Sequence, residues 1–168
     1  AIGQNSTPQF ASTNIPLQEV EKITLPLLDN EQLYQAEMDR RGPGIAPNFA
    51  KNIAVHITPK THGTWEDLSN QTSVWRLVIE SIGAKSLNLG FGQYKMPREG
   101  KLMLYTPNQS IVQGPFTRAD NEDHEQLWTP IIEGDNLVIE VTVPTKSKSK
   151  IQLQLDYVNH DFIGFTSM

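Results

Sequence analysis

The stretch WRLVIESIGAKSLNLGF, residues 75–91, decides the fold class, because apolar and polar side chains alternate on both sides of one short turn. Its two halves, residues 75–80 and 86–91, place their large apolar side chains two residues apart, which is the spacing of one face of a β-strand. Ile82 and Gly83 supply the turn between them. The stretch therefore predicts two β-strands, each with one face toward a core.

The same pattern continues through most of the chain. Short alternating segments recur between turns rich in Gly, Pro and Asn, and a single helical pattern interrupts them. The further candidate strands cover residues 20–25, 52–57, 101–106, 126–129, 136–143 and 151–157. Seven or eight strands at this spacing predict an all-β fold, an antiparallel β-sandwich or jelly roll with one N-terminal helix, and argue against a doubly wound α/β fold.

The predicted helix covers residues 30–41. Asp29 precedes it and can cap its first turn, with Gln32 in the capping-box position. Arg40 and Arg41 lie at its negative end, where cations are favourable, and the Gly-Pro-Gly sequence that follows ends it.

The chain length fits one domain with a leader. Residues 1–25 are expected to form a flexible leader that includes an edge strand. Residues 26–165 form the helix and β-sandwich domain, and residues 166–168 a tail or linker toward a downstream domain.

Composition excludes several function classes. A net charge of -5 gives no field that favours nucleic acid, and no apolar run approaches the roughly 20 residues of a membrane span. The absence of cysteine removes disulfides and zinc–thiolate sites but permits secretion, because a core of this size can stabilise the fold. The one basic concentration, Lys146, Lys148 and Lys150, alternates with Ser and is interpreted as a solvated hairpin tip.

No catalytic set is recognisable in the sequence. No serine lies in a Gly-x-Ser-x-Gly context, which would mark an exposed nucleophile. The four histidines are scattered and lack the i, i+4 spacing of a metal hydrolase; they are His56, His62, His124 and His160. The residues therefore predict a chain that is not an enzyme.

An acidic loop is the strongest local candidate for a metal site. Asp120 and Asp123, with Asp135 from a neighbouring turn, offer hard oxygen ligands of the kind that Ca²⁺ prefers. The loop does not match an EF-hand. The competing interpretation is that Asp120 and Asn121 hydrogen-bond their own turn while Glu122 and Glu125 face water. No other cofactor is expected.

Two tryptophans are candidate ligand-binding residues. Trp75 follows the alternation of a core strand and is expected to be buried, whereas the pattern does not place Trp65 or Trp128. If both are exposed on one concave face, they form a stacking platform for a sugar. This alternative describes a secreted carbohydrate-binding β-sandwich, stabilised by calcium at the Asp120 loop.

Six segments, taken in order, resemble a known family. They are TWEDL (64–68), WRLVIES (75–81), GAKSLNLGFGQYKMPREGKLMLY (83–105), GPFTRADNEDHEQLWTP (114–130), GDNLVIEV (134–141) and VNHDFIGF (158–165). Together they resemble the N-terminal pro-region of bacterial secreted trypsin-like serine endopeptidases of the lysyl endopeptidase type. The resemblance covers roughly residues 26–165.

This resemblance implies a secreted or periplasmic precursor segment that assists folding or export of a protease, or inhibits it until cleaved. Its partner is then a downstream or cognate protease domain, and no catalytic residue carries over because no position matches the triad motifs. Residues 1–16 and 159–168 are the expected segments for occluding an active-site cleft. Residues 40–41 and 146–150 are basic sequences that a basic-specific protease can cut when exposed.

Overall fold

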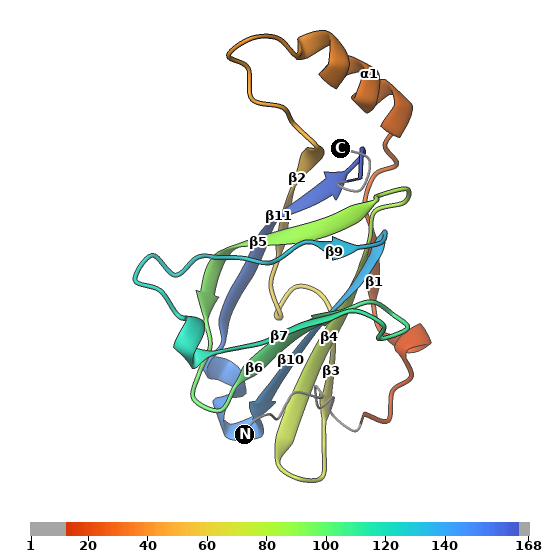
Figure 1. The fold of residues 1–168 in the computed structure, drawn as a ribbon. Coiled ribbons are helices and arrows are strands. Elements are labelled where there is room, and N and C mark those ends of the chain that lie inside the picture. Colours follow the sequence, from red (N-terminus) through yellow and green to blue (C-terminus); the bar gives the residue numbers. More distant parts are fainter. Residues whose placement is uncertain (1–12, 165–168) are drawn as a thin grey trace.

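Two β-sheets packed face to face form the body of the molecule, and one helix stands off one end (Figure 1). The computed structural model describes residues 13–164. The predicted all-β sandwich with one N-terminal helix is confirmed. No helix among the described residues is long and apolar enough to span a membrane.

Sheet A contains six strands. They are β1 (Lys22–Thr24), β3 (Thr64–Asp67), β4 (Thr72–Glu80), β6 (Lys101–Tyr105), β7 (Val112–Thr117) and β10 (Asn136–Pro144). The order is β1-β4-β10-β6-β7, and β3 also pairs with β4. The β1–β4 pair is parallel, whereas the other pairs in this sheet are antiparallel.

Sheet B contains five strands, all antiparallel. They are β2 (Ala50–Ile57), β5 (Ser86–Lys95), β8 (Leu127–Trp128), β9 (Ile132–Glu133) and β11 (Gln152–Asp161). The order is β2-β11-β5, and both β8 and β9 pair with β5. The strand β2 therefore forms a long free edge of this sheet.

Three strands were not predicted: β3, β7 and β9. The sequence of β7, VQGPFT, contains the Gly-Pro pair that normally marks a turn. It forms a strand because it lies at the edge of sheet A, where a proline removes no needed ladder bond. The other two are too short to show a period.

The main core lies between the sheets. Alternate side chains of β4, namely Trp75, Leu77 and Ile79, meet Leu87 and Leu89 of β5 there. The prediction that Trp75 is buried is confirmed, since it is 1% exposed. The expected solvent face of β4 is buried as well, because residues 13–20 cover it.

These residues of the leader form a second, smaller core on the outer face of sheet A. Val20 packs there with Val78, Met103 and Val138, and η1 (Leu17–Glu19) lies beside them. Residues 13–20 of the predicted leader thus pack against the sandwich, and the domain boundary at residue 26 stays a prediction. Residues 1–12 lie outside the described part of the chain.

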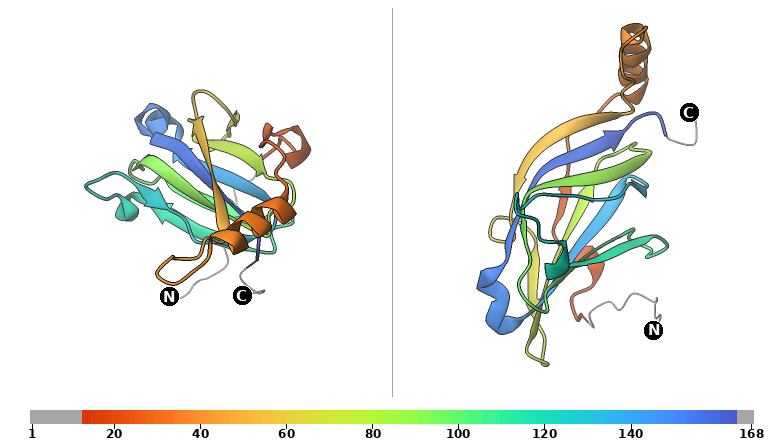
Figure 2. Two further views of the ribbon diagram at one scale, coloured as in Figure 1. Left: turned by 90° about the horizontal axis from the view of Figure 1, so that it is seen from above. Right: turned by 60° about the vertical axis from the view of Figure 1, so that its left-hand side comes forward.

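The helix α1 (Asn30–Arg40) belongs to an arm, residues 26–49, that projects from the sandwich and returns into β2 (Figure 2). The Asp29 cap is confirmed, because its side chain accepts a hydrogen bond from the backbone N–H of Gln32. Figure 1 and the right-hand view of Figure 2 show α1 beyond the end of the two sheets.

Besides η1, the described residues contain two further 3-10 helices, η2 (Arg118–Asp120) and η3 (Thr145–Lys150). The segment η3 joins β10 of sheet A to β11 of sheet B. The interpretation of residues 146–150 as a hairpin tip is therefore wrong, because the two flanking strands belong to different sheets.

Candidate functional site

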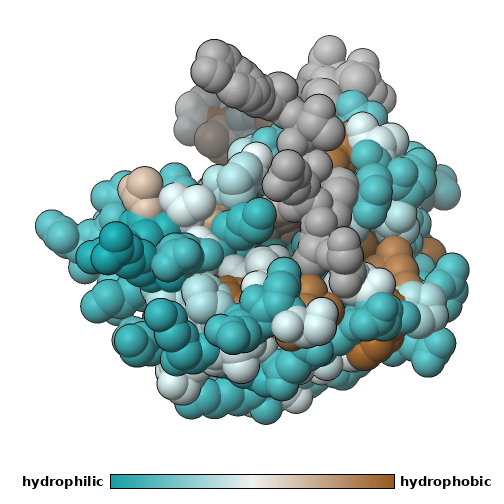
Figure 3. Space-filling model, turned by 90° about the horizontal axis from the view of Figure 1, so that it is seen from below, coloured by the Kyte–Doolittle hydropathy of each residue, from teal (hydrophilic) through white to brown (hydrophobic). Residues whose placement is uncertain are grey.

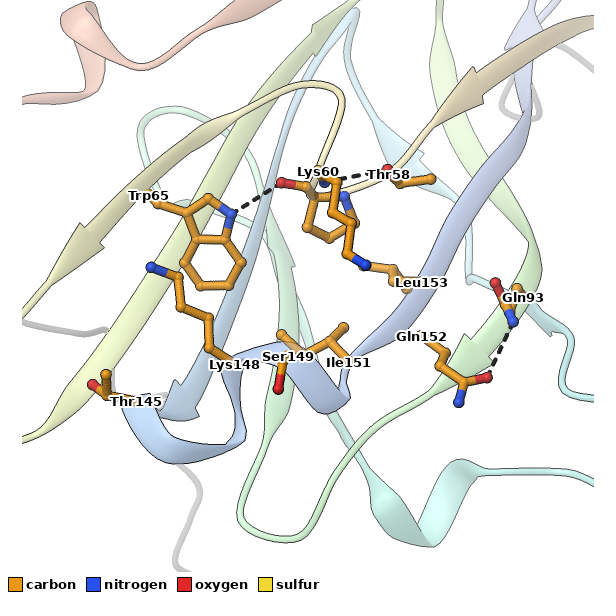
Figure 4. A pocket seen from close by; sticks show the side chains of 11 residues that line it. Thr58, Lys60, Trp65, Gln93, Thr145, Lys148, Ser149, Ile151, Gln152 and Leu153 are labelled. Atoms are coloured by element: carbon orange, nitrogen blue, oxygen red, sulfur yellow. Dashed lines mark hydrogen bonds between the residues drawn. The ribbon is translucent and has the colours of Figure 1, made fainter.

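A cavity of about 500 Å³ opens at one end of the sandwich, between the loop after β2, η3 and the start of β11 (Figure 4). Trp65 forms one wall, and its indole Nε1 donates to the carbonyl of Pro59 at 3.0 Å. The Nζ of Lys148 lies 4.6 Å from the centre of the Trp65 ring and 3.2 Å from Oδ1 of Asp67. One face of Trp65 is thus already occupied by a lysine of the same chain.

Trp128 lies elsewhere, on sheet B. Its side chain is 52% exposed and lies parallel to the ring of Tyr157, with ring centres 6.1 Å apart. Trp65, by contrast, is partly buried against the main core from sheet A. The two tryptophans do not form the predicted joint patch. Sequence reasoning missed Tyr157; Gly90 inside a strand was the available signal, because such a glycine often marks a close approach.

The three aspartates of the predicted calcium site do not come together. Asp120 Oδ2 accepts from the backbone N–H of Thr117 at 2.7 Å, which closes a capping box. Asp135 Oδ2 accepts from the N–H of Gly83 at 3.3 Å. Asp123 is exposed in the loop after η2.

The strand β5 separates these turns. Its start is tied to the Asp135 turn by Gly134 N–H to Lys85 O, 3.0 Å, and its far end to the Asp120 loop by Met96 N–H to Asn121 Oδ1, 2.9 Å. A strand of this length spans roughly 30 Å. Within residues 13–164 no group of three or more His, Cys, Asp or Glu side chains can hold a metal ion. Asp120 bonds its own turn, as the competing interpretation expects, whereas Asn121 contacts the backbone of Met96 and Asp135 that of Gly83 in another turn.

A buried polar cluster links the arm to the sandwich. The Oγ of Ser81 lies 2.6 Å from Nδ1 of His160, and Nε2 of His160 lies 2.7 Å from Oδ1 of Asn30. The amide nitrogen of Asn30 donates to the carbonyl of Gly83 at 2.7 Å, so its oxygen faces the imidazole. Nε2 of His160 therefore donates to Asn30, and in the neutral ring Nδ1 accepts from the Ser81 hydroxyl.

The hydrogen-bond contact between Ser81 and His160 resembles that of a hydrolase dyad, but the pair is not accessible to a substrate. Ser81 is 1% exposed and His160 0% exposed, so no substrate reaches the hydroxyl. The pair instead fastens the end of β4 to β11 and to the first turn of α1. Sequence reasoning missed it because the two residues are 79 positions apart and only the fold joins them.

His160 makes the stability of the fold depend on pH. Burial lowers the pKa of His160 below its ordinary value of 6.5, although the carboxylates of Asp161 and Asp135 act in the opposite direction. Below about pH 6.5 the unfolded chain takes up a proton that the folded chain resists. The stabilising contribution is therefore complete above that pH and is lost as the pH falls toward the folded-state pKa.

We expect urea unfolding to show this loss between about pH 7.5 and about pH 5 in the wild type. His160→Gln keeps a hydrogen-bonding side chain but cannot titrate, so its stability should change less over the same interval. Equal pH slopes for the two proteins would show that His160 does not carry the effect.

A comparison with known protein families gives a match that covers the arm and both sheets. A family model described as the lysyl endopeptidase N-terminal domain matches residues 24–162, from the end of β1 through the arm and both sheets into the turn after β11. No solved structure matches the chain. The family match covers most of the sequence and agrees with the resemblance carried by the six ordered segments. The chain therefore belongs to the lysyl endopeptidase N-terminal domain family.

Proposed function

We propose that this chain is the non-catalytic N-terminal pro-domain of a secreted serine endopeptidase, which binds the protease domain, assists its folding and keeps it inactive until cleavage. The family match is the observation that carries this proposal. The buried Ser81–His160 pair offers no accessible nucleophile and so gives no reason to assign catalysis to it.

The arm is the surface that best fits such a partner. Leu27 is 74% exposed, and Tyr34 and Ile45 are also exposed on this segment. Among the residues of α1 only Glu37 is buried, so the helix has almost no packing partner within the described chain. Exposed apolar side chains gathered on one projecting element are typical of a protein-binding surface. The opposite end of the sandwich, seen from below, is mainly hydrophilic where described residues are visible (Figure 3).

The arm is held in one shape by a clamp around Glu37. The carboxylate accepts from Nε of Arg40 at 3.0 Å and of Arg41 at 2.9 Å, and from the backbone N–H of Asn48 at 2.7 Å. The Arg40 hydrogen bond is the largest of the contributions that lower the pKa of Glu37 to about 2. The clamp joins α1 to the returning loop, and a preordered element loses less entropy when it binds. Arg40 and Arg41 are thus structural, beyond complementing the helix dipole.

The described parts of the two terminal segments are less suited to occlude a cleft. Residues 13–16 lie against sheet A, where the carbonyl of Ile15 accepts from Arg76. Residues 159–161 complete β11, and Phe162 is buried. Residues 1–12 and 165–168 lie outside the described chain. The free edge of β2, directly after the arm, offers an alternative place for an extended protease segment to add as a strand.

The test measures inhibition by the arm. The wild-type domain, titrated into the cognate protease domain, should inhibit hydrolysis of a small lysyl substrate dose-dependently and in competition with substrate. Leu27→Asp combined with Tyr34→Asp should weaken inhibition by at least about tenfold, because it places charges in an apolar contact. Ile131→Asp is the matched control, since Ile131 is equally apolar and 56% exposed but lies between β8 and β9.

Two results would contradict the proposal. Absence of inhibition by folded, uncleaved domain would exclude the inhibitory role. Equal inhibition by the arm variant and the Ile131 control would exclude the arm as the contact surface.

A further inference from the structure

We propose that the outer face of sheet B binds a neutral glycan, with Trp128 and Tyr157 as its stacking platform. Both side chains point away from the main core, and they are 52% and 40% exposed. Their rings are parallel within 7°. Two parallel, exposed aromatic rings on one sheet present apolar surface of the kind that packs against the faces of sugar rings.

The backbone beneath the rings keeps this platform flat. Gly90 lies between the two aromatic residues, since it pairs with Tyr157 on β11 and with Trp128 on β8. A Cβ at Gly90 would stand 2.5 Å from the Trp128 ring, so the ring rests directly on β5. Ala54 extends the same row across β2. Apart from the two rings, this row carries only small residues, so no large side chain blocks an extended ligand chain that lies across it.

Side-chain amides border the platform on one side. Asn52, Asn159 and Asn88 form the next row of the same face, and Nδ2 of Asn52 donates to Oδ1 of Asn159 at 2.9 Å. An amide offers both donors and acceptors, as a sugar hydroxyl also does, so an amide row can pair with hydroxyls of either role.

On the other side of the platform lies one carboxylate, that of Asp156, which disfavours a negatively charged ligand. Asp156 lies with Oδ2 over Gly92 and accepts from Nε2 of Gln154 at 2.7 Å. A carboxylate accepts hydrogen bonds from hydroxyls but repels an anionic ligand. The surroundings thus favour a neutral glycan over an acidic one. A peptide strand is disfavoured at this position, because the backbone groups of β5 and β11 are already paired within the sheet.

This surface is separate from the arm, so the proposal stands or falls independently of protease inhibition. The experiment titrates chitohexaose and cellohexaose into the full chain and follows binding by calorimetry and by the NMR signal of the Trp128 indole N–H. We expect at least one oligosaccharide to bind with a Kd of about 1 mM or tighter and to shift that signal. Trp128→Ala and Tyr157→Ala should each weaken binding by at least about tenfold.

Tyr34→Ala is the matched control, because Tyr34 is 45% exposed but lies on α1. It should bind the oligosaccharide as the wild type does. The proposal is overturned if the folded wild type binds neither oligosaccharide, or if the Trp128 signal does not move on binding. It is also overturned if the face instead mediates self-association that Trp128→Ala abolishes without any glycan affinity.

Discussion

Arg76→Met is expected to lower the free energy of unfolding by about 3–5 kcal/mol, the typical effect of removing one member of a buried charge pair. Arg76 is 6% exposed and lies directly opposite Glu140, which is 3% exposed, in the β4–β10 ladder. It also lies 3.7 Å from Glu66 and donates to the carbonyl of Ile15 at 2.6 Å. The substitution removes the cation but leaves the buried carboxylates. It also removes the hydrogen bond from Arg76 to the carbonyl of Ile15, which ties the leader to sheet A.

Urea unfolding at neutral pH measures the loss, and a double variant separates its causes. Arg76→Met combined with Glu140→Leu removes the cation and the fully buried carboxylate and leaves only Glu66, so part of the lost stability should return. A single variant within about 1 kcal/mol of the wild type would contradict the expectation. The expectation would also be contradicted if the double variant lost more unfolding free energy than the two single variants lose together.

Arg76 also shows where sequence reasoning ends. Its position between Trp75 and Leu77 follows the alternation of a strand, which correctly predicts β4 and its inward face. The alternation cannot show that residues 13–20 return to cover the opposite face, because that packing joins segments about 60 positions apart. The Asp29 cap, by contrast, depends on three neighbouring positions and was predicted to the residue.

In the candidate site, too, local sequence predicts single residues but not which residues the fold brings together. The sequence identified Trp128 as an aromatic residue without a core position, and the structure shows it exposed. Its partner Tyr157 lies on another strand and is brought near only by the β5–β11 register. Asp120 and Asp135 were ambiguous because Asp serves both turns and metal ions, and local sequence does not fix how far apart two turns lie.

Gly63→Ala is expected to lower the free energy of unfolding by about 2–4 kcal/mol, by combining overpacking with backbone strain. Gly63 has a φ of +96°, and a Cβ there would stand 2.1 Å from Nε1 of Trp75. The indole cannot move aside easily, because this nitrogen donates to the carbonyl of His62 at 2.8 Å and the ring is buried in the core. A methyl group therefore forces either the loop or the largest core side chain to shift.

Gly134→Ala is the matched control for the backbone contribution. Gly134 has a φ of +116°, but a Cβ there meets no atom within 4 Å. Its variant should lose only about 1 kcal/mol, the cost of a positive φ for alanine. Urea unfolding followed by tryptophan fluorescence compares the two variants. Equal losses would mean that the Trp75 indole yields to the added methyl group at no cost, whereas a larger loss at Gly63 measures how firmly the His62 carbonyl and the core hold that ring.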